Sequence, residues 1–354
     1  MKNIAEVDKN FKVETNIGKE DAVFFDIQSE PFKIYGVFYE DGMFRRMPQK
    51  IADSVSEGVA YLNMNTAGGR VKFKTDSPYV AIVAKMHGVG QMSNFSMTGN
   101  AGFDLYFRRD GVEVYKSSFI PPVDMKDGYE GVIELGSSEM RDITINFPTY
   151  SGVYSLYIGV SDKSEILAAD PYKIEKPVVY YGSSITQGGC AVRPGNSYQG
   201  FISRRFDCNY TNLGFSGNAK GEDEIAEYIK ELDMSMFVYD YDYNAPTVEH
   251  LVATHEKMFK TIRTKNPNLP IIMLSRPKIY LSDEEKERRE TVERTYLNAV
   301  EAGDKNVYYI SGAELMKYTY NDGSVDSIHP NDLGFWSMAN VLGDFIEKAA
   351  LLKK

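Results

Sequence analysis

The sequence is poor in cysteine and has no long apolar run. Its two cysteines, Cys190 and Cys208, are too few for a fold that disulfides stabilise, and they suit a reducing compartment. No stretch approaches the roughly 18 uninterrupted apolar residues that a membrane-spanning helix needs. Acidic residues, Glu6 and Asp8, stand where a secretory signal would carry its apolar run. We therefore expect a cytoplasmic protein that does not enter the membrane and whose thiols are free.

Basic residues are outnumbered by acidic ones, 40 Lys and Arg against 50 Asp and Glu, which gives a formal net charge of −10. A surface of this sign has no general attraction for nucleic acid or anionic lipid headgroups, so we expect neither as a partner and favour a neutral substrate. Apolar residues make up 43% of the chain and charged residues 25%, which is typical of folded globular proteins and excludes disorder. The sequence does not determine the oligomeric state and is compatible with a homo-oligomer.

Histidine is also scarce, with four in the whole chain. His250 and His255 are five residues apart, about 140° around a helix, so they do not share a face as the i and i+4 ligands of a zinc site do. His87 stands beside Gly88 at the end of a predicted strand. We interpret His250 and His255 as solvated or packing residues and His87 as a strand-end or loop residue, and we expect no metal and no cofactor. His329 remains as the candidate for chemistry.

The first half of the chain has the pattern of an antiparallel β domain. Short β-branched or aromatic runs alternate with Gly, Asp, Asn and Pro, which favours many short strands in a jelly-roll-like β-sandwich. Asp110 and Gly111 lie between two such runs and predict a tight hairpin turn. The strands are expected at residues 61–65, 69–75, 79–86, 103–108, 112–117, 129–135, 141–147 and 154–160.

The second half alternates short apolar runs with segments of helical length. This pattern predicts a parallel sheet with helices on both faces, a three-layer α/β/α domain of the flavodoxin-like kind. A chain of 354 residues is near the limit for one hydrophobic core. We therefore expect two domains, residues 1–172 and 173–354. The strands are expected at 178–181, 210–213, 236–239, 271–274 and 307–310, and the helices at 222–232, 248–265, 283–302 and 331–352.

Polar motifs follow the apolar runs of the second half, and an open parallel sheet binds its ligands at the carboxyl ends of its strands. Ser184 lies where the first run gives way to a turn and a helix, in the sequence G-S-S-I-T-Q-G at 182–188. Backbone N–H groups at a helix start can stabilise an oxyanion, so Ser184 is a candidate nucleophile. Taken alone, the run is more typical of a turn and a helix cap.

Asp326 stands three residues before His329, just ahead of the last predicted helix. An Asp at this spacing can orient the imidazole through one ring nitrogen while the other nitrogen takes a proton from a serine. The loops after the second and third runs contain Gly217 and Asn244, whose backbone and side-chain N–H groups are candidate donors to an oxyanion. Taken singly, each loop is more typical of an ordinary turn or a solvated segment.

In their order along the chain, these motifs resemble the sequence blocks of the SGNH hydrolase superfamily, also called the GDSL esterases and lipases. The resemblance covers residues 173–354. It implies that Ser184 is the nucleophile, that His329 is the general base, and that Asp326 orients it. It also implies that Ser184, Gly217 and Asn244 provide the oxyanion hole.

Two positions depart from the superfamily pattern. Ser183 replaces the Asp of the first block, Gly-Asp-Ser, so the hydrogen bonding around the nucleophile is expected to differ. The third block reads D-Y-D-Y-N at 240–244 instead of Gly-x-Asn-Asp, so Asn244 is matched to the Asn of a block whose other residues differ.

The N-terminal half carries a second resemblance. The sequence G-F-D-L-Y at 102–106 is similar to the Gly-x-Asp-Leu-Tyr signature of a module that precedes one SGNH subgroup. Similar layouts of a β-sandwich and an SGNH domain occur among carbohydrate acetyl esterases, which remove O-acetyl groups from plant polysaccharides and their fragments. The resemblance implies an esterase that releases short acyl groups, acetyl in particular, from oligosaccharides. We interpret Asp104 and Tyr106 as structural strand residues and Cys190 as a bystander.

Other functions stay open at this point. The ester substrate need not be a carbohydrate, and the same three residues could serve an acyltransferase that passes the acyl group to another acceptor. A binding protein with an idle α/β half is a further alternative, but the intact Ser184, Asp326 and His329 argue against it.

Overall fold

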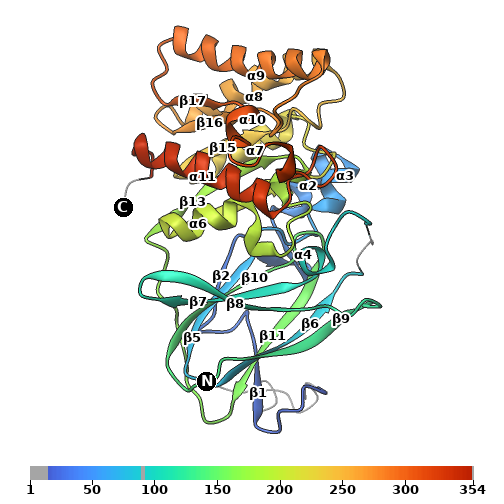
Figure 1. Cartoon of the computed structure of the whole chain (residues 1–354), viewed down its shortest axis with the longest axis vertical. Coiled ribbons are helices and arrows are strands. Elements are labelled where there is room, and N and C mark those ends of the chain that lie inside the picture. The colour runs from blue at the N-terminus through green and yellow to red at the C-terminus, as the bar shows by residue number, and fades with distance from the viewer. Residues whose placement is uncertain (1–14, 89–91, 353–354) are drawn as a thin grey trace. The chain divides into compact units, whose positions relative to one another are not determined.

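A computed structural model of the chain describes residues 15–88 and 92–352 (Figure 1). The acidic residues Glu6 and Asp8 lie outside the described residues. The chain forms two compact units, and the main change from one to the other comes between Pro171 and Tyr172. Two short segments are exchanged across this boundary, because Met47–Asn63 belongs to the second unit and Val192–Gly195 to the first. The observed units therefore differ from the expected single division at 172/173 in these two segments and in Tyr172, which belongs to the second unit.

The first unit is built from antiparallel strands. Ile143 and Ile145 of β10 are fully buried, and they share an apolar core with Ile82 of β6 and Leu156 of β11, so both sheets turn one face inward. This confirms the predicted antiparallel β domain. One sheet has the order β1 (Ala22–Asp26), β11 (Val153–Ser161), β6 (Tyr79–Met86), β9 (Gly128–Glu134), and the other the order β12 (Ile166–Leu167), β5 (Arg70–Thr75), β10 (Arg141–Asn146), β7 (Phe103–Arg109), β8 (Val112–Phe119).

Smaller elements complete this unit. Strand β2 (Lys33–Tyr35) pairs with β5, and β3 (Phe38–Glu40) pairs with β4 (Met43–Arg45). A single turn of helix, α4 (Met97–Asn100), precedes β7.

The predicted hairpin joins β7 and β8. Arg109 pairs with Val112, so the loop holds only Asp110 and Gly111, with φ of 51° and 80°. Positive φ at both loop residues is the backbone that a two-residue turn needs to follow the right-handed strand twist. Aspartate tolerates it and glycine adopts it freely, which is why this prediction is confirmed.

The D-L-Y segment of β7 binds the short segment Val192–Gly195. The buried carboxylate of Asp104 accepts hydrogen bonds from Asn146 Nδ2 at 2.7 Å, Arg193 Nη1 at 3.1 Å and Gly195 N at 2.9 Å. Tyr106 Oη also contacts Arg193. A Cβ at Gly195 would lie 2.6 Å from the Tyr106 hydroxyl, so only glycine fits there. These contacts agree with the structural interpretation of Asp104 and Tyr106.

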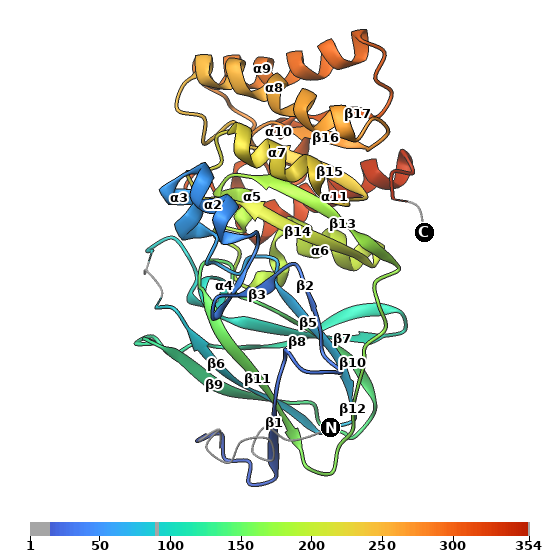
Figure 2. The ribbon, with the colours of Figure 1, turned by 180° about the vertical axis from the view of Figure 1, so that it is seen from behind.

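The strand predicted at residues 61–65 is wrong. Its first two residues end the helix α3 (Glu57–Leu62), which follows α2 (Gln49–Val55); both helices, coloured blue, are labelled in Figure 2. Ser56 caps α3, because its side chain accepts a hydrogen bond from Val59 N. Val59 and Leu62, one helical turn apart, pack into the apolar core of the second unit. Burial at helical spacing outweighs the β propensity of the run around Tyr61.

The second unit contains a five-stranded parallel sheet in the order β14-β13-β15-β16-β17. In chain order this is 2-1-3-4-5, the flavodoxin-like arrangement, whose switch point lies between β13 and β15. The predicted parallel sheet is confirmed. The strands are β13 (Ile174–Gly182), β14 (Cys208–Gly214), β15 (Met236–Asp240), β16 (Ile271–Leu274) and β17 (Val307–Ile310).

Helices cover both faces of this sheet (Figures 1 and 2). Val179 and Tyr181 of β13 point into a core shared with α2, α3, α7, α8 and α9, whereas Val178 and Tyr180 point into a core shared with α6, α10 and α11. Strands buried on both faces explain the nearly continuous apolar runs in the sequence. The helices are α5 (Ser184–Gln187), α6 (Tyr198–Phe206), α7 (Asp223–Glu231), α8 (Val248–Lys265), α9 (Asp283–Glu301), α10 (Gly312–Leu315) and α11 (Asp332–Lys348).

The longer predicted helices of this unit match those observed, and α8 has the predicted bounds. Helix α6 was not among the predictions, although Ser197 caps it and Ile202 is buried beneath it. Within residues 15–88 and 92–352, every helix is too short or too polar to cross a membrane.

Candidate active site

Ser184 begins α5, a single helical turn directly after the first strand of the parallel sheet, β13. Ser183 caps this turn by accepting a hydrogen bond from Ile185 N at 3.2 Å. Gly188 ends it with φ of 99°, a left-handed conformation that suits glycine. Ser184 is 8% exposed, so its hydroxyl lies at the edge of the protein interior.

A chain of two hydrogen bonds connects Ser184 to an imidazole and a carboxylate. Ser184 Oγ lies 2.9 Å from His329 Nε2, and His329 Nδ1 lies 2.8 Å from Asp326 Oδ2. The structure thus brings together the three residues that the sequence singled out as nucleophile, base and orienting acid. This order of groups allows the imidazole to accept the serine proton at Nε2 while Nδ1–H donates to the carboxylate.

The loop that carries Asp326 and His329 is a tight reversal of the chain. Val325 N donates to the His329 carbonyl at 2.9 Å, and Ser324 and Pro330 form an antiparallel bridge. Ser327, at the tip, has φ of 68°, which lets the chain turn back. The reversal therefore brings Asp326 and His329 close together within one loop.

Asp326 is held in its ionised form. Burial acts to raise its pKa, but hydrogen bonds from the backbone and ring of His329 and from Ile328 N outweigh this and lower the pKa to about 2. The distances are 2.8 Å to His329 N and 3.0 Å to Ile328 N, both from Oδ1. An ionised Asp326 favours the His329 tautomer with its proton on Nδ1, which leaves Nε2 as the acceptor.

Buried polar groups from neighbouring elements hold the helical turn of Ser184. Thr186 Oγ1 donates to Asp240 Oδ1 at 2.6 Å, and the Thr186 carbonyl accepts from Asn212 Nδ2 and Gln199 Nε2, both at 2.7 Å. Ser183 N donates to the Asp240 carbonyl at 3.3 Å, which joins β13 and β15 at the switch point. The position of Ser184 is thus determined by contacts from β14, β15 and α6.

Asp240 is a functional candidate that the sequence reasoning did not single out. It ends β15 and is 4% exposed. Burial raises its pKa to about 7, and the hydrogen bond from Thr186 opposes that rise. Its position directly after an apolar run is one that the sequence could have marked as part of the site. It was not predicted, because an acidic residue after a strand is more often solvated than buried.

The side chain of Asn244 is bound to the start of the loop that contains Gly217. Asn244 Nδ2 donates to the Phe215 carbonyl at 2.9 Å, and Phe215 begins the loop that contains Gly217. Gly217 has φ of 68°, so the loop needs glycine or a strained residue there. An amide nitrogen carries two hydrogens, so the second hydrogen of Asn244 Nδ2 can serve an oxyanion.

The other histidines occupy positions that packing explains. His255 is buried between Thr295, to which it hydrogen-bonds at 2.9 Å, and the stacked rings of Tyr239 and Tyr241. Burial lowers its pKa to about 3. His250 Nε2 lies 2.8 Å from the Lys220 carbonyl, and His87 Nδ1 lies 3.0 Å from Tyr154 Oη. Across the described part of the chain, acidic residues, histidines and cysteines form no group of three that could hold a metal ion.

Both cysteines are buried, and neither forms a disulfide. Burial raises the pKa of Cys190 to about 12, with a smaller contribution from the negative charge of Asp326. A thiol that stays protonated is a poor nucleophile, in agreement with the interpretation of Cys190 as a residue without a role in the chemistry.

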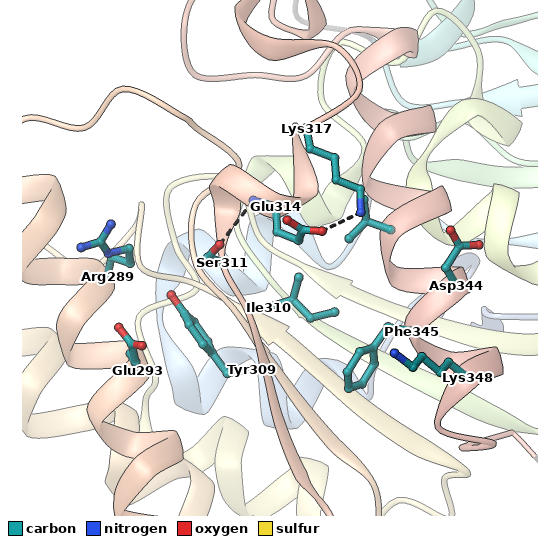
Figure 3. A pocket seen from close by; sticks show the side chains of 11 residues that line it. Arg289, Glu293, Tyr309, Ile310, Ser311, Glu314, Lys317, Asp344, Phe345 and Lys348 are labelled. Carbon is teal, nitrogen blue, oxygen red and sulfur yellow. Dashed lines mark hydrogen bonds and ion pairs between the residues drawn. The ribbon is translucent and has the colours of Figure 1, made fainter.

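A cleft of about 760 Å³ lies elsewhere in the second unit, at the edge strand β17 (Figure 3). Tyr309 of β17 and Phe345 of α11 line it, together with ionisable residues of both signs. Among these, Lys317 donates to Glu314 at 2.6 Å. None of Ser184, Asp326 and His329 contributes to this cleft, and its mixed charge favours no class of ligand.

Two family models match the chain in succession. Residues 175–347 match the GDSL-like Lipase/Acylhydrolase family, and residues 22–166 match a module described as the N-terminus of Esterase_SGNH_hydro-type, GxDLY. The C-terminal unit belongs to the GDSL-like lipase/acylhydrolase family. The chain is thus an SGNH-type esterase or acylhydrolase that carries a GxDLY module. No curated protein matches the chain.

Solved structures share this two-part layout. A protein from Bacteroides ovatus ATCC 8483, described as a GDSL-like lipase, is 28% identical, with a TM-score of 0.85 over 94% of this chain and 99% of its own. A salicylyl-acyltransferase from a tetracycline biosynthetic pathway is 17% identical, with a TM-score of 0.77 over the same shares. An acetyl xylan esterase from the rumen bacterium Butyrivibrio proteoclasticus is 14% identical, with a TM-score of 0.57 over 93% and 99%. At identities this low, the last two show that the fold is shared.

Proposed function

We propose that this SGNH-type acylhydrolase is a serine esterase that removes acetyl groups from O-acetylated oligosaccharides. The observation that carries the chemistry is the pair of hydrogen bonds from Ser184 to His329 and from His329 to Asp326, at 2.9 and 2.8 Å. The substrate class is supported by the layout shared with the acetyl xylan esterase and by the net negative charge, which favours a neutral substrate.

The proposed reaction runs in two steps. Ser184 Oγ attacks the ester carbonyl while His329 Nε2 takes the serine proton, and Asp326 stabilises the imidazolium that results. N–H groups of Ser184, Gly217 and Asn244 stabilise the oxyanion. The sugar hydroxyl then leaves with the proton from His329, and water, activated by the same imidazole, releases acetate from the acyl-enzyme.

Acyl transfer is the second candidate, because a salicylyl-acyltransferase shares the fold over 94% of this chain. In that reaction an acceptor hydroxyl or amine would replace water in the second step, and the same three residues would act. The candidates differ only in what resolves the acyl-enzyme.

Acetate release from acetylated xylo- and manno-oligosaccharides tests the proposal. We expect acetate from the full-length protein and none from Ser184→Ala, and higher activity on nitrophenyl acetate than on long-chain nitrophenyl esters. Activity on nitrophenyl esters without release of acetate from the sugars would contradict the carbohydrate substrate. A product that appears only with an added acceptor would favour acyl transfer.

A further inference from the structure

The loop after β15 carries Asn244, and two buried arginines from outside this loop bind its backbone. Arg288 Nη1, from α9, donates to the carbonyls of Asp242 and Ala245 at 2.9 and 2.8 Å. Arg276 Nη2, which follows β16, donates to the same Asp242 carbonyl at 3.3 Å. These carbonyls flank Asn244 on both sides, so the two guanidinium groups hold the loop around it.

The side chains of this loop add to the same arrangement. Asp242 is 1% exposed, and its Oδ2 accepts from the backbone N and the Nε of Arg276, both at 3.2 Å. The guanidinium carbon of Arg276 lies 4.1 Å from the centre of the Tyr243 ring. Arg276 is thus in contact with each of the two residues before Asn244.

In the third block, this chain differs from the superfamily pattern, and the difference explains why two arginines bind the loop. The superfamily pattern Gly-x-Asn-Asp places its glycine two residues before the Asn, where this chain has Asp242. A carboxylate buried there needs a cation, and Arg276 supplies it. The last residue of the pattern is Ala245 in this chain, so its side chain contributes no hydrogen bond to the loop, whereas its carbonyl is bound by Arg288.

We propose that Arg276 and Arg288 are positioning residues, which hold the Asn244 amide where it donates to the oxyanion. This inference rests on the proposed function, in which Asn244 stabilises the transition state. The amide is itself bound to the Phe215 carbonyl at 2.9 Å. If the loop shifted, the amide and the loop of Gly217 would separate. Small displacements of a preorganised donor reduce turnover more than substrate binding.

Arg263 offers a matched control in the same unit. Like Arg288 it is a largely buried arginine that donates to backbone carbonyls, those of Asn266, Leu269 and Asn306 at 2.6 to 3.1 Å. These carbonyls lie before β16 and β17, at the amino ends of the strands and therefore at the opposite end of the sheet from Ser184. A lysine at any of these positions keeps the charge but cannot reproduce the fork of donors.

The kinetic test uses the full-length protein and nitrophenyl acetate. Arg288→Lys and Arg276→Lys should each lower kcat roughly tenfold with KM little changed, and neither should lower it further when Asn244→Ala is already present. Arg263→Lys should leave kcat within about twofold of the unchanged protein, even where it lowers the Tm. Equal loss of kcat in Arg288→Lys and Arg263→Lys, or losses that multiply with that of Asn244→Ala, would overturn the inference.

A structural test separates this inference from the proposed function. Crystal structures of Arg288→Lys, Arg276→Lys and Arg263→Lys should show the hydrogen bond from Asn244 to Phe215 broken or displaced in the first two proteins and intact in the third. An unchanged Asn244 in both of the first two would refute the positioning role, whether or not the protein hydrolyses esters. Absence of any ester hydrolysis by the unchanged protein would instead refute the proposed function.

Discussion

Ser184 and His329 are 145 residues apart in the chain, yet their side chains meet at 2.9 Å. Ser184 lies at the carboxyl end of β13, and His329 lies in the reversal that leads into α11. Asp326 completes the arrangement from within the same reversal. An ionised carboxylate, a correctly oriented imidazole and a hydroxyl at the end of a strand are the groups that acyl transfer through a serine requires.

Substitutions at these residues should separate into two classes. Ser184→Ala and His329→Ala should each lower kcat by about 10⁴ to 10⁶, because proton transfer and covalent bond formation depend on them. Asn244→Ala should lower it by roughly 10² to 10³, because it removes one donor to the oxyanion. Steady-state hydrolysis of nitrophenyl acetate measures both. If Ser184→Ala kept a tenth of the activity, Ser184 would not be the nucleophile.

The end of a helix or strand lies next to each of these side chains and helps to fix its position. Asn331 caps α11, two residues after His329, and its Oδ1 accepts from Leu333 N and Gly334 N at 3.0 and 3.1 Å. Its Nδ2 donates to the Asp322 carbonyl at 2.8 Å. The start of the last helix is thus tied to the segment before the loop of Asp326 and His329.

Removal of this cap should affect both stability and catalysis. Asn331→Ala should lower the free energy of unfolding by about 1 kcal/mol, and Asn331→Ser should restore part of the loss because serine also caps helices. The kcat of Asn331→Ala should fall as well, since the cap adjoins the His329 loop. Urea unfolding and ester hydrolysis on the same samples measure the two effects. Equal stability of the Ala and Ser variants would argue against a capping role.

In the first unit, the strand β7 has a comparable role for the segment Val192–Gly195. Asp104 is fully buried and is paired with Arg193. Asp104→Ala should therefore lower the free energy of unfolding by about 3 to 5 kcal/mol, because it removes the buried carboxylate that pairs with the Arg193 guanidinium and accepts from Asn146 and Gly195. Denaturant unfolding measures this loss. A loss below about 1 kcal/mol would contradict the structural interpretation of the D-L-Y motif.

At the scale of the whole molecule, Asp240 makes stability depend on pH. Its pKa is about 7 in the folded protein against an ordinary value of 3.8, so the folded state binds the proton more tightly than the unfolded state. The contribution of Asp240 to the free energy of unfolding is fully present below about pH 4 and is lost as the pH rises to about 7. Asp326, with its pKa lowered to about 2, has the opposite sign, and its contribution is lost only in stronger acid.

Replacement of Asp240 by asparagine should remove this dependence, since an amide can still accept from Thr186 but does not ionise in this range. As the pH rises from 4 to 7, the free energy of unfolding of the unchanged protein should fall relative to that of Asp240→Asn. Urea unfolding across that range measures it. Parallel pH profiles for the two proteins would show that Asp240 does not titrate there.

The sequence predicted much of this architecture because its signals are local. Continuous apolar runs mark buried parallel strands, and the spacing of Asp326 and His329 lies within a single loop. Residues 47–63 were missed because their helices are stabilised by packing on a distant sheet. Arg276, Arg288 and Asp240 were missed for a similar reason, because a charged residue is read as solvated until the fold buries it. The catalytic roles themselves remain predictions.

Trapping of the acyl-enzyme tests the central claim most directly. The protein is mixed with nitrophenyl acetate, quenched in acid within one turnover, and digested for mass spectrometry. The account predicts that the peptide containing Ser184 gains the mass of one acetyl group, and that the gain is absent in Ser184→Ala. Rapid nitrophenol release with the acetyl group on another residue, or on none, would contradict it.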